Sequence, residues 1–184
     1  FGGNMGLGQA LDTVLEAAQR LSHLPDIQFV FAGDGVDKAR LEALAQETGL
    51  ANVRFLGQQQ AEKMPYLYSL SDVLLAHYKR DPLFEISIPS KLFAYMACRR
   101  PVLMASDGDA ADLVKAAGAG VTCMAEDPDA LAKAVVELYS MPPDERAKMG
   151  AAGRQAFLQQ YSRNVLLQRH EELLSQVARL GAKL

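Results

Sequence analysis

The sequence predicts an α/β fold, built on a doubly wound, Rossmann-like parallel sheet of about six strands and followed by a helical C-terminal tail. Two observations support this prediction. Short, almost continuously apolar segments alternate with longer segments in which apolar residues recur at helical spacing, and glycine-rich turns follow several of the short segments. Strands that are apolar on both faces and separated by helices are typical of parallel sheets covered on both sides.

The strands are expected where β-branched and aromatic residues form short runs bounded by turn residues. These runs are residues 27–32, 53–56, 73–76, 101–105 and 121–124. A sixth strand is expected to end at Phe1, because Gly2, Gly3 and Asn4 follow it directly, as a turn follows a strand. Such a start also leads us to expect that residues 1–184 are a fragment of a longer protein.

The helices are expected where apolar residues recur every three or four positions. They are predicted between the first glycine-rich loop and residue 25, from about 39 to 49, and at 61–68, 90–98, 109–117 and from 127 onwards. The tail, residues 143–184, has no strand signal and is expected to form two or more helices with a break near 161–163. Because the last helix has an apolar face, we expect that face to pack on another surface.

The composition excludes several classes of protein. The chain has 184 residues, 49% of them hydrophobic and 22% charged, with a net charge of -3. A single domain of this size can bury a full core without disulfides or metals, and no basic excess is present to hold a nucleic acid. Cys98, Cys123 and the three histidines lack metal-ligand spacing. No apolar run is long enough to span a bilayer. From these observations together we expect a cytoplasmic protein that binds neither a metal nor a nucleic acid.

Glycine-rich turns are expected to meet at one edge of the sheet. Residues 2–8, residues 33–35 and Gly57 each follow a strand, and the carboxyl ends of parallel strands form the edge where α/β sheets bind ligands. Glycine lets the backbone approach a ligand, and the next helix offers free N–H groups to a phosphate. The first loop lacks the G-x-G-x-x-G spacing, so a phosphate site and a turn without ligand both stay open.

The segment from Pro82 to Arg100 carries the second group of candidate residues. A helix is predicted to begin at Ser90, with Lys91 in its first turn, where the helix dipole disfavours a cation unless an anion is bound. We therefore expect a phosphate or diphosphate held by N–H groups, the Ser90 hydroxyl and the Lys91 ammonium. Glu85, in a predicted loop, can accept hydrogen bonds from sugar hydroxyls. A solvated lysine and a solvated loop acid remain the alternatives.

This segment resembles the nucleotide-sugar motif of the retaining GT-B glycosyltransferases of the group 1 type, family 4. The resemblance lies in Phe84-Glu85, Pro89-Ser90-Lys91-Leu92-Phe93, Tyr95-Met96-Ala97-Cys98 and Pro101-Val102, together with residues 3–6, 33–35, 53–57 and 71–73. It covers nearly the whole chain, as the C-terminal, donor-binding half of such an enzyme. The resemblance therefore implies one half of a GT-B architecture, with residues 1–184 as its nucleotide-sugar-binding domain.

The resemblance implies roles for four residues around the predicted helix start. Glu85 would be the catalytic acid that contacts the donor sugar. Pro89, Ser90 and Lys91 would bind the donor diphosphate.

It also implies roles for five residues of the glycine-rich turns. Gly3, Asn4 and Gly6 would bring the first loop to the diphosphate and the reacting carbon. Gly57 and Gln58 would lie near the loop that receives the base.

The resemblance further implies what the whole protein does. It would be a retaining hexosyltransferase that moves a sugar from a UDP-sugar or another NDP-sugar to a glycan or lipid-linked acceptor in surface polysaccharide synthesis, with no metal and no cofactor besides the donor. Its own N-terminal domain would provide the acceptor site, so this fragment is not expected to turn over alone. The full-length protein would be cytoplasmic or peripheral to the inner membrane.

Two positions depart from the family pattern. Ala94 stands where the family has a second acid that holds the ribose hydroxyls, and loss of that acceptor costs about 1–3 kcal/mol. Arg99 stands where glycine usually ends the helix in the left-handed conformation. These departures leave two alternatives open: a non-catalytic or degenerate GT-B-like binding or partner domain, and a protein similar to UDP-sugar 2-epimerases.

Overall fold

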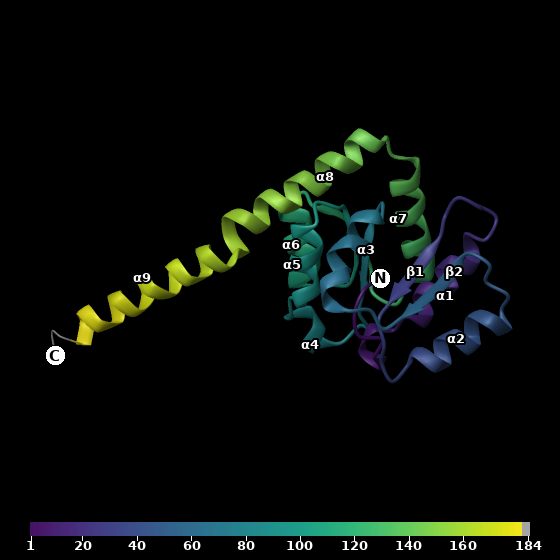
Figure 1. Cartoon of the computed structure of the whole chain (residues 1–184), viewed down its shortest axis with the longest axis horizontal. Coiled ribbons are helices and arrows are strands. Elements are labelled where there is room, and N and C mark those ends of the chain that lie inside the picture. Colours follow the sequence, from purple (N-terminus) through teal and green to yellow (C-terminus); the bar gives the residue numbers. More distant parts are fainter. Residues whose placement is uncertain (182–184) are drawn as a thin grey trace.

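The computed structural model describes residues 1–181 as an α/β body from which one long helix projects (Figure 1). The strands are β1 (Phe29–Ala32), β2 (Val53–Gly57), β3 (Leu74–His77), β4 (Val102–Ala105) and β5 (Gly120–Cys123). The helices are α1 (Asp12–Arg20), α2 (Lys38–Glu47), α3 (Met64–Leu70), α4 (Pro82–Glu85), α5 (Ser90–Ala97), α6 (Asp109–Ala116), α7 (Pro128–Ser140), α8 (Pro143–Ala156) and α9 (Arg163–Gly181). Short turns are η1 (Leu7–Gln9), η2 (Ala61–Lys63) and η3 (Phe157–Tyr161).

The strands are parallel, as predicted, but they number five in the described residues and not about six. The strand expected to end at Phe1 is represented only by an isolated bridge between Gly2 and Ala32. The physical reason is that two residues provide too little backbone for a ladder of several rungs. The sheet is also divided, because β1 pairs only with β2, while β3 pairs with β4 and β4 with β5.

The core consists of two apolar clusters, and alternate residues of β3 and β4 belong to one cluster or the other, as on the two faces of a sheet. The first lies between β1 and the helices α1 and α7, and includes Leu15, Phe31 and Leu131. The second lies between β3, β4 and the helices α5 and α6, and includes Leu92 and Met104. All residues of β3 and β4 are buried, as expected for strands covered on both faces.

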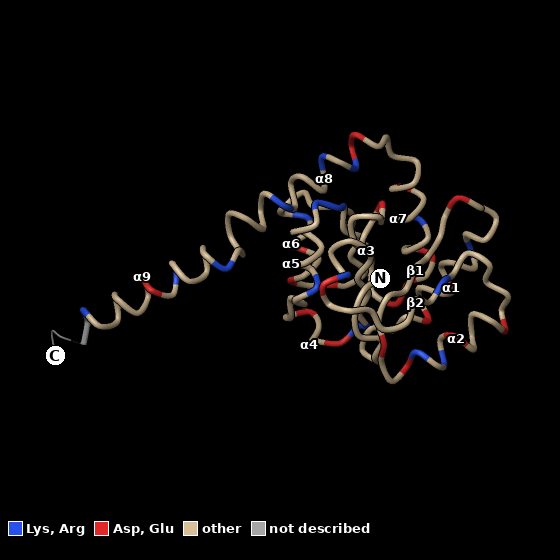
Figure 2. The backbone as a smooth tube through the Cα atoms, in the orientation of Figure 1, with Lys and Arg blue, Asp and Glu red and all other residues tan. Residues whose placement is uncertain are grey.

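The helix α9 leaves the body of the molecule after the break at Ser162, which was predicted near this position (Figure 1). Five of its apolar residues are exposed; they are Leu166, Leu167, Leu173, Leu174 and Val177. The expectation that this face packs on another surface is therefore not met within the described residues. Positive and negative residues both occur along α2, α8 and α9 (Figure 2). No described helix is long and apolar enough to cross a bilayer.

Candidate functional site

Backbone packing holds the glycine-rich loops together at the carboxyl edge of the strands. The Gly3 N–H donates to the Ala32 carbonyl (2.9 Å), and the Gly33 N–H donates to the Gly57 carbonyl (2.8 Å). A Cβ on Gly33 would stand 1.9 Å from the Gly3 oxygen, and its φ of +149° disfavours any side chain. We call residues 2–8, residues 33–35 and Gly57 the loop wall. Their predicted convergence is confirmed.

The helix α5 begins beside this loop wall. Pro89 precedes its first residue, Ser90, and no side chain caps its free N–H groups. The Lys91 Nζ lies 3.5 Å from the point where a Cβ on Gly3 would stand, and 4.0 Å from the centroid of the Phe1 ring. It is buried and has no hydrogen-bond partner among the described residues. Burial lowers the pKa of Lys91 to about 8.

Tyr95 is a residue of this region that the sequence predictions missed. Its hydroxyl accepts a hydrogen bond from the Gly2 N–H (2.9 Å) and donates to the Gly2 carbonyl (3.2 Å). Burial raises the pKa of Tyr95, so the hydroxyl stays protonated and able to donate. The spacing in the sequence could have indicated this residue, because residues four apart, such as Lys91 and Tyr95, lie on one face of a helix. We call Ser90, Lys91 and Tyr95 the helix wall.

Aromatic contacts place α4 next to the loop wall and the helix α5. The Phe84 ring lies 5.2 Å from the Tyr78 ring, centroid to centroid, and the Tyr78 ring lies 5.7 Å from the Lys91 Nζ. A Cβ on Gly8 would stand 2.7 Å from Phe84 Cζ, so the first loop packs directly on this ring. Tyr78 and Phe84 therefore connect α4, α5 and the loop wall.

Glu85 is the last residue of α4, whereas the sequence predicted it in a loop. The helix forms because the Asp81 side chain accepts the Leu83 N–H (2.9 Å) and Pro82 occupies the first helical position, where its fixed φ is favourable. The Glu85 side chain is exposed, and its carbonyl group packs on Gly108. Glu85 thus lies beside the loop that follows β4.

The other predicted loop residues surround the loop wall. Asn4 is exposed, and its side chain lies against both Gly6 and Gly35. The Gly6 N–H donates to the Gln9 side chain (2.9 Å), which shapes the turn into η1. Gln58 is exposed just after β2.

The two residues that depart from the family pattern lie on or just after α5. Ala94 is exposed on the helix surface. Arg99 has a φ of 58°, so the left-handed position expected at this helix end is confirmed, and a non-glycine residue occupies it.

His77 supports the site without facing it. Its ring Nδ1 lies 2.7 Å from the Gln9 carbonyl, and its Nε2 lies 3.3 Å from the Glu126 N–H. Burial lowers the pKa of His77. A neutral ring that donates from Nδ1 and accepts at Nε2 satisfies both contacts, so His77 links the end of β3 to two loops.

Comparisons with known proteins identify the family of this chain. The family model described as "Glycosyl transferases group 1" matches residues 2–156. The chain belongs to the group 1 glycosyltransferases. The sequence relatives and the structural neighbours are GT-B glycosyltransferases.

Two relatives and one structure illustrate the similarity. WcaI of Escherichia coli K12 is named as a putative colanic acid biosynthesis glycosyl transferase. It is 40% identical over 97 residues, which are 53% of this chain and 23% of that protein. A GDP-mannose-dependent monoacylated alpha-(1-6)-phosphatidylinositol monomannoside mannosyltransferase of Corynebacterium glutamicum is 28% identical over 166 residues, 89% of this chain and 43% of that protein. Anabaena HepE in complex with UDP superposes with a TM-score of 0.79 at 18% identity, covering 95% of this chain and 48% of its own.

The matched regions therefore cover between about a quarter and a half of the length of these proteins. The resemblance of the sequence to group 1 enzymes and the GT-B fold is confirmed.

Proposed function

We propose that residues 1–184 form the donor-binding half of a retaining hexosyltransferase that uses a UDP-sugar or another NDP-sugar. The observation that carries the proposal is the Lys91 ammonium, which is buried beside Gly3 without a hydrogen-bond acceptor in the described residues. A buried charge without partners is costly. A diphosphate between the loop wall and the helix wall would provide both the opposite charge and the acceptors.

The similar proteins support the choice of donor and pathway. The structure of HepE contains UDP, which favours a UDP-sugar as the donor. The C. glutamicum relative is named as GDP-mannose-dependent, so a GDP-sugar is the second candidate donor. The name of the E. coli relative favours a role in surface polysaccharide synthesis, with a glycan or lipid-linked acceptor. Under this proposal the protein works in the cytoplasm or at the cytoplasmic face of the membrane.

The proposed mechanism is electrostatic. As the bond between sugar and diphosphate breaks, negative charge grows on the leaving diphosphate, and the Lys91 ammonium, the Ser90 hydroxyl and the N–H groups of α5 would stabilise it. This set of donors would do so without a metal or a cofactor besides the donor substrate. Glu85 would hold hydroxyls of the donor sugar.

The remaining residues would position the donor. Gly3, Asn4 and Gly6 would approach the diphosphate, and Gly57 and Gln58 would lie near the base. An N-terminal domain of the full-length protein would provide the acceptor site.

The test is calorimetric titration of the full-length protein with UDP and with GDP. Hydrogen bonds to charged groups contribute about 1.5–3 kcal/mol, so Lys91→Met is expected to raise the Kd of the preferred nucleotide by about 10- to 150-fold. The matched control is Lys115→Met, since Lys115 is exposed and pairs only with Asp112 on the surface (3.6 Å). Its Kd should equal that of the wild type.

Failure of both nucleotides to bind the full-length wild type would contradict the proposal and favour the degenerate binding domain, which Ala94 motivates. With an active full-length enzyme, the anomeric configuration of the product, measured by NMR, tests whether the sugar is transferred with retention.

A further inference from the structure

Glu126, on the turn between β5 and α7, has a backbone conformation that its residue type disfavours. Its φ of 51° lies in the left-handed region, where a Cβ atom is crowded and glycine is the favoured residue. Strained residues of this kind persist only where the surrounding structure holds them, and they cluster at functional sites. The hydrogen bonds of Glu126 therefore indicate what its side chain does.

Two hydrogen bonds hold Glu126 against the segment that follows β3. Its N–H donates to the His77 Nε2 (3.3 Å), and its carboxylate accepts the Arg80 N–H (2.6 Å). A carboxylate is a stronger acceptor than a neutral side chain. The Glu126 side chain thus makes a contact with the chain leading to α4 that a glycine at this position could not make.

Arg80 connects two turns at the carboxyl edge of the sheet. Its guanidinium donates to the Ala125 carbonyl (3.2 Å) and pairs with Asp107 (3.4 Å) in the loop after β4. Gly108 follows in that loop, and a Cβ there would stand 2.1 Å from the Glu85 carbonyl oxygen. The loop after β4 therefore packs directly on the backbone of Glu85.

The helix α4 begins just after Arg80 and ends at Glu85. The Glu85 N–H donates to the carbonyl of Asp81, the residue that caps this helix (3.2 Å). A helix of four residues is not stable by itself, because its single turn must offset the whole cost of nucleation. The position of Glu85 therefore depends on the segments attached to α4, with Arg80 at its start and Gly108 at its end.

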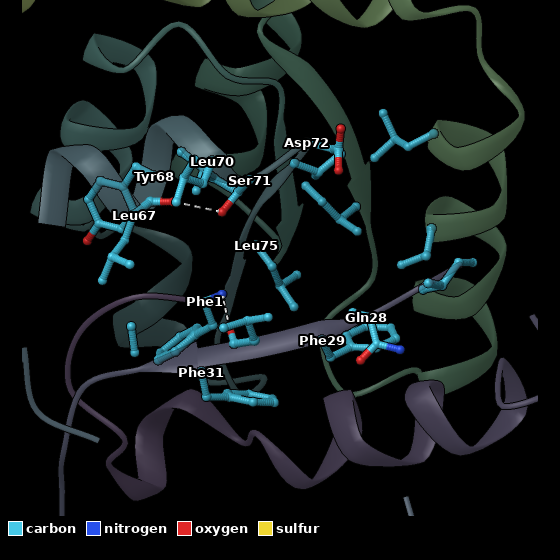
Figure 3. Close-up of a pocket in the computed structure, with 18 of the residues that line it drawn as sticks. Phe1, Gln28, Phe29, Phe31, Leu67, Tyr68, Leu70, Ser71, Asp72 and Leu75 are labelled. Atoms are coloured by element: carbon cyan, nitrogen blue, oxygen red, sulfur yellow. Dashed lines mark hydrogen bonds between the residues drawn. The ribbon is translucent and has the colours of Figure 1, made fainter. Parts of the chain in front are cut away.

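The helix wall is anchored by other contacts. Tyr95 bonds to Gly2, and its ring meets the Tyr68 ring of α3 edge-on, with 5.0 Å between the centroids. Tyr68 borders an apolar cleft of about 620 Å³ between α3 and β1, which Figure 3 shows. These contacts involve neither Arg80 nor Glu126. The groups assigned to the diphosphate and the acid assigned to the sugar are therefore fixed by separate parts of the molecule.

We propose that Glu126 is a positioning residue for the donor sugar, and that through Arg80 it holds α4 so that Glu85 reaches the sugar hydroxyls. The inference rests on the proposed function and deepens it, because it separates recognition of the sugar from recognition of the nucleotide. Loss of the Glu126 carboxylate weakens the contribution of the sugar to donor binding. Binding of the nucleotide diphosphate stays almost unchanged.

The first measurement is residue-resolved hydrogen exchange on the full-length protein without ligand. In Glu126→Gly, the Glu85 amide should exchange at least about tenfold faster than in the wild type, because α4 loses its anchor at Arg80. The Cys98 amide, which bonds to the Ala94 carbonyl at the end of α5 (3.1 Å), should keep its wild-type rate. Glycine suits the left-handed conformation, so this variant should stay folded.

The second measurement is calorimetric titration of the same proteins with UDP, GDP, UDP-glucose and GDP-mannose. In Glu126→Gly, the Kd of each free nucleotide should stay within about threefold of the wild-type value. For the sugar nucleotide that binds, the ratio of its Kd to that of the free nucleotide should rise by about tenfold, because Glu85 no longer meets the sugar hydroxyls.

Two further variants serve as controls. Glu126→Gln keeps an oxygen that can accept the Arg80 N–H, so it should restore both measurements to within about threefold of the wild type. Arg99→Gly also replaces a left-handed residue (φ 58°) by glycine, but outside both walls. It should change neither the exchange of Glu85 nor the ratio of the Kd values.

The possible results separate this inference from the proposed function. Failure of the wild type to bind UDP and GDP would contradict the proposed function itself. With normal nucleotide binding, three results would overturn the inference: a Glu85 amide that exchanges equally fast in the wild type and Glu126→Gly, an unchanged ratio of the Kd values, or equal impairment of Glu126→Gln and Glu126→Gly.

Discussion

The two walls of the candidate site are built from different parts of the chain. The loop wall consists of backbone, and its shape depends on the absence of side chains, since Gly33 lies directly against the Gly3 carbonyl. The helix wall consists of side chains, since Lys91 and Tyr95 project from α5 toward Gly2 and Gly3. The loop wall should therefore be sensitive to added atoms and the helix wall to removed polar atoms.

The largest effect is expected from adding a methyl group to the loop wall. Gly33→Ala would place a Cβ 1.9 Å from the Gly3 oxygen, so the two loops would have to separate. We expect the unfolding free energy to fall by more than about 3 kcal/mol and UDP binding to become undetectable. Gly49→Ala is the matched control, because Gly49 also has a positive φ (+66°) but no atom within 4 Å. The Gly49→Ala substitution should lower the unfolding free energy by about 1–2 kcal/mol and leave UDP binding unchanged. Urea unfolding and titration measure both, and normal UDP binding by Gly33→Ala would refute the packing of the loop wall.

The next effect concerns the charge on the helix wall. Because the pKa of Lys91 is lowered to about 8, the ammonium loses its proton in the unliganded protein as the pH rises above 8. Diphosphate binding needs the protonated form, so the Kd for UDP should rise by about fivefold from pH 8 to pH 9. Titrations at several pH values measure this, with Lys91→Met as the control for all other groups. An equal pH dependence in both proteins would rule out Lys91 as the titrating group.

The unfolding free energy should increase over the same pH range in which UDP binding weakens. Between pH 8 and the ordinary lysine pKa of 10.5, the unfolded chain binds more protons at Lys91 than the folded chain does. The contribution of this group to stability therefore increases with pH in that window.

A smaller effect is expected where the two walls meet. Tyr95→Phe removes the acceptor of the buried Gly2 N–H, which should lower the unfolding free energy by about 1–3 kcal/mol. The rise in the Kd for UDP should be smaller than that caused by Lys91→Met, because Tyr95 acts by positioning Gly2. The control is Tyr66→Phe, since Tyr66 is 66% exposed. The unfolding free energy of this variant should stay within about 0.5 kcal/mol of the wild-type value. Equal stability of the two variants would show that the hydroxyl does not connect the walls.

The smallest effect is expected just beyond the end of α5. Arg99→Gly would relieve the positive φ of 58° and should raise the unfolding free energy by about 0.5–1 kcal/mol, after the larger entropy loss of glycine is included. UDP binding should not change, because Arg99 lies outside both walls. A loss of stability on urea unfolding would mean that the Arg99 side chain contributes more than the backbone strain costs.

Local patterns were sufficient to predict most of the fold. The five internal strands and the start of α5 at Ser90 follow from residues close in sequence, because hydrophobic periodicity and proline act locally. The left-handed position at Arg99 was expected from the family pattern. The helix α4 was not predicted, because its four residues are too few to show helical periodicity. The convergence of the glycine loops was also predictable, since parallel strands place their carboxyl ends together.

The sequence by itself thus determined the elements, the family and the side of the sheet where the loops meet. Only the tertiary structure decided that Lys91 is buried without an acceptor among the described residues, and that Tyr95 bonds to Gly2 across 93 positions of sequence. Burial and long-range hydrogen bonds depend on which distant segments pack together, and no pattern of neighbouring residues contains that information.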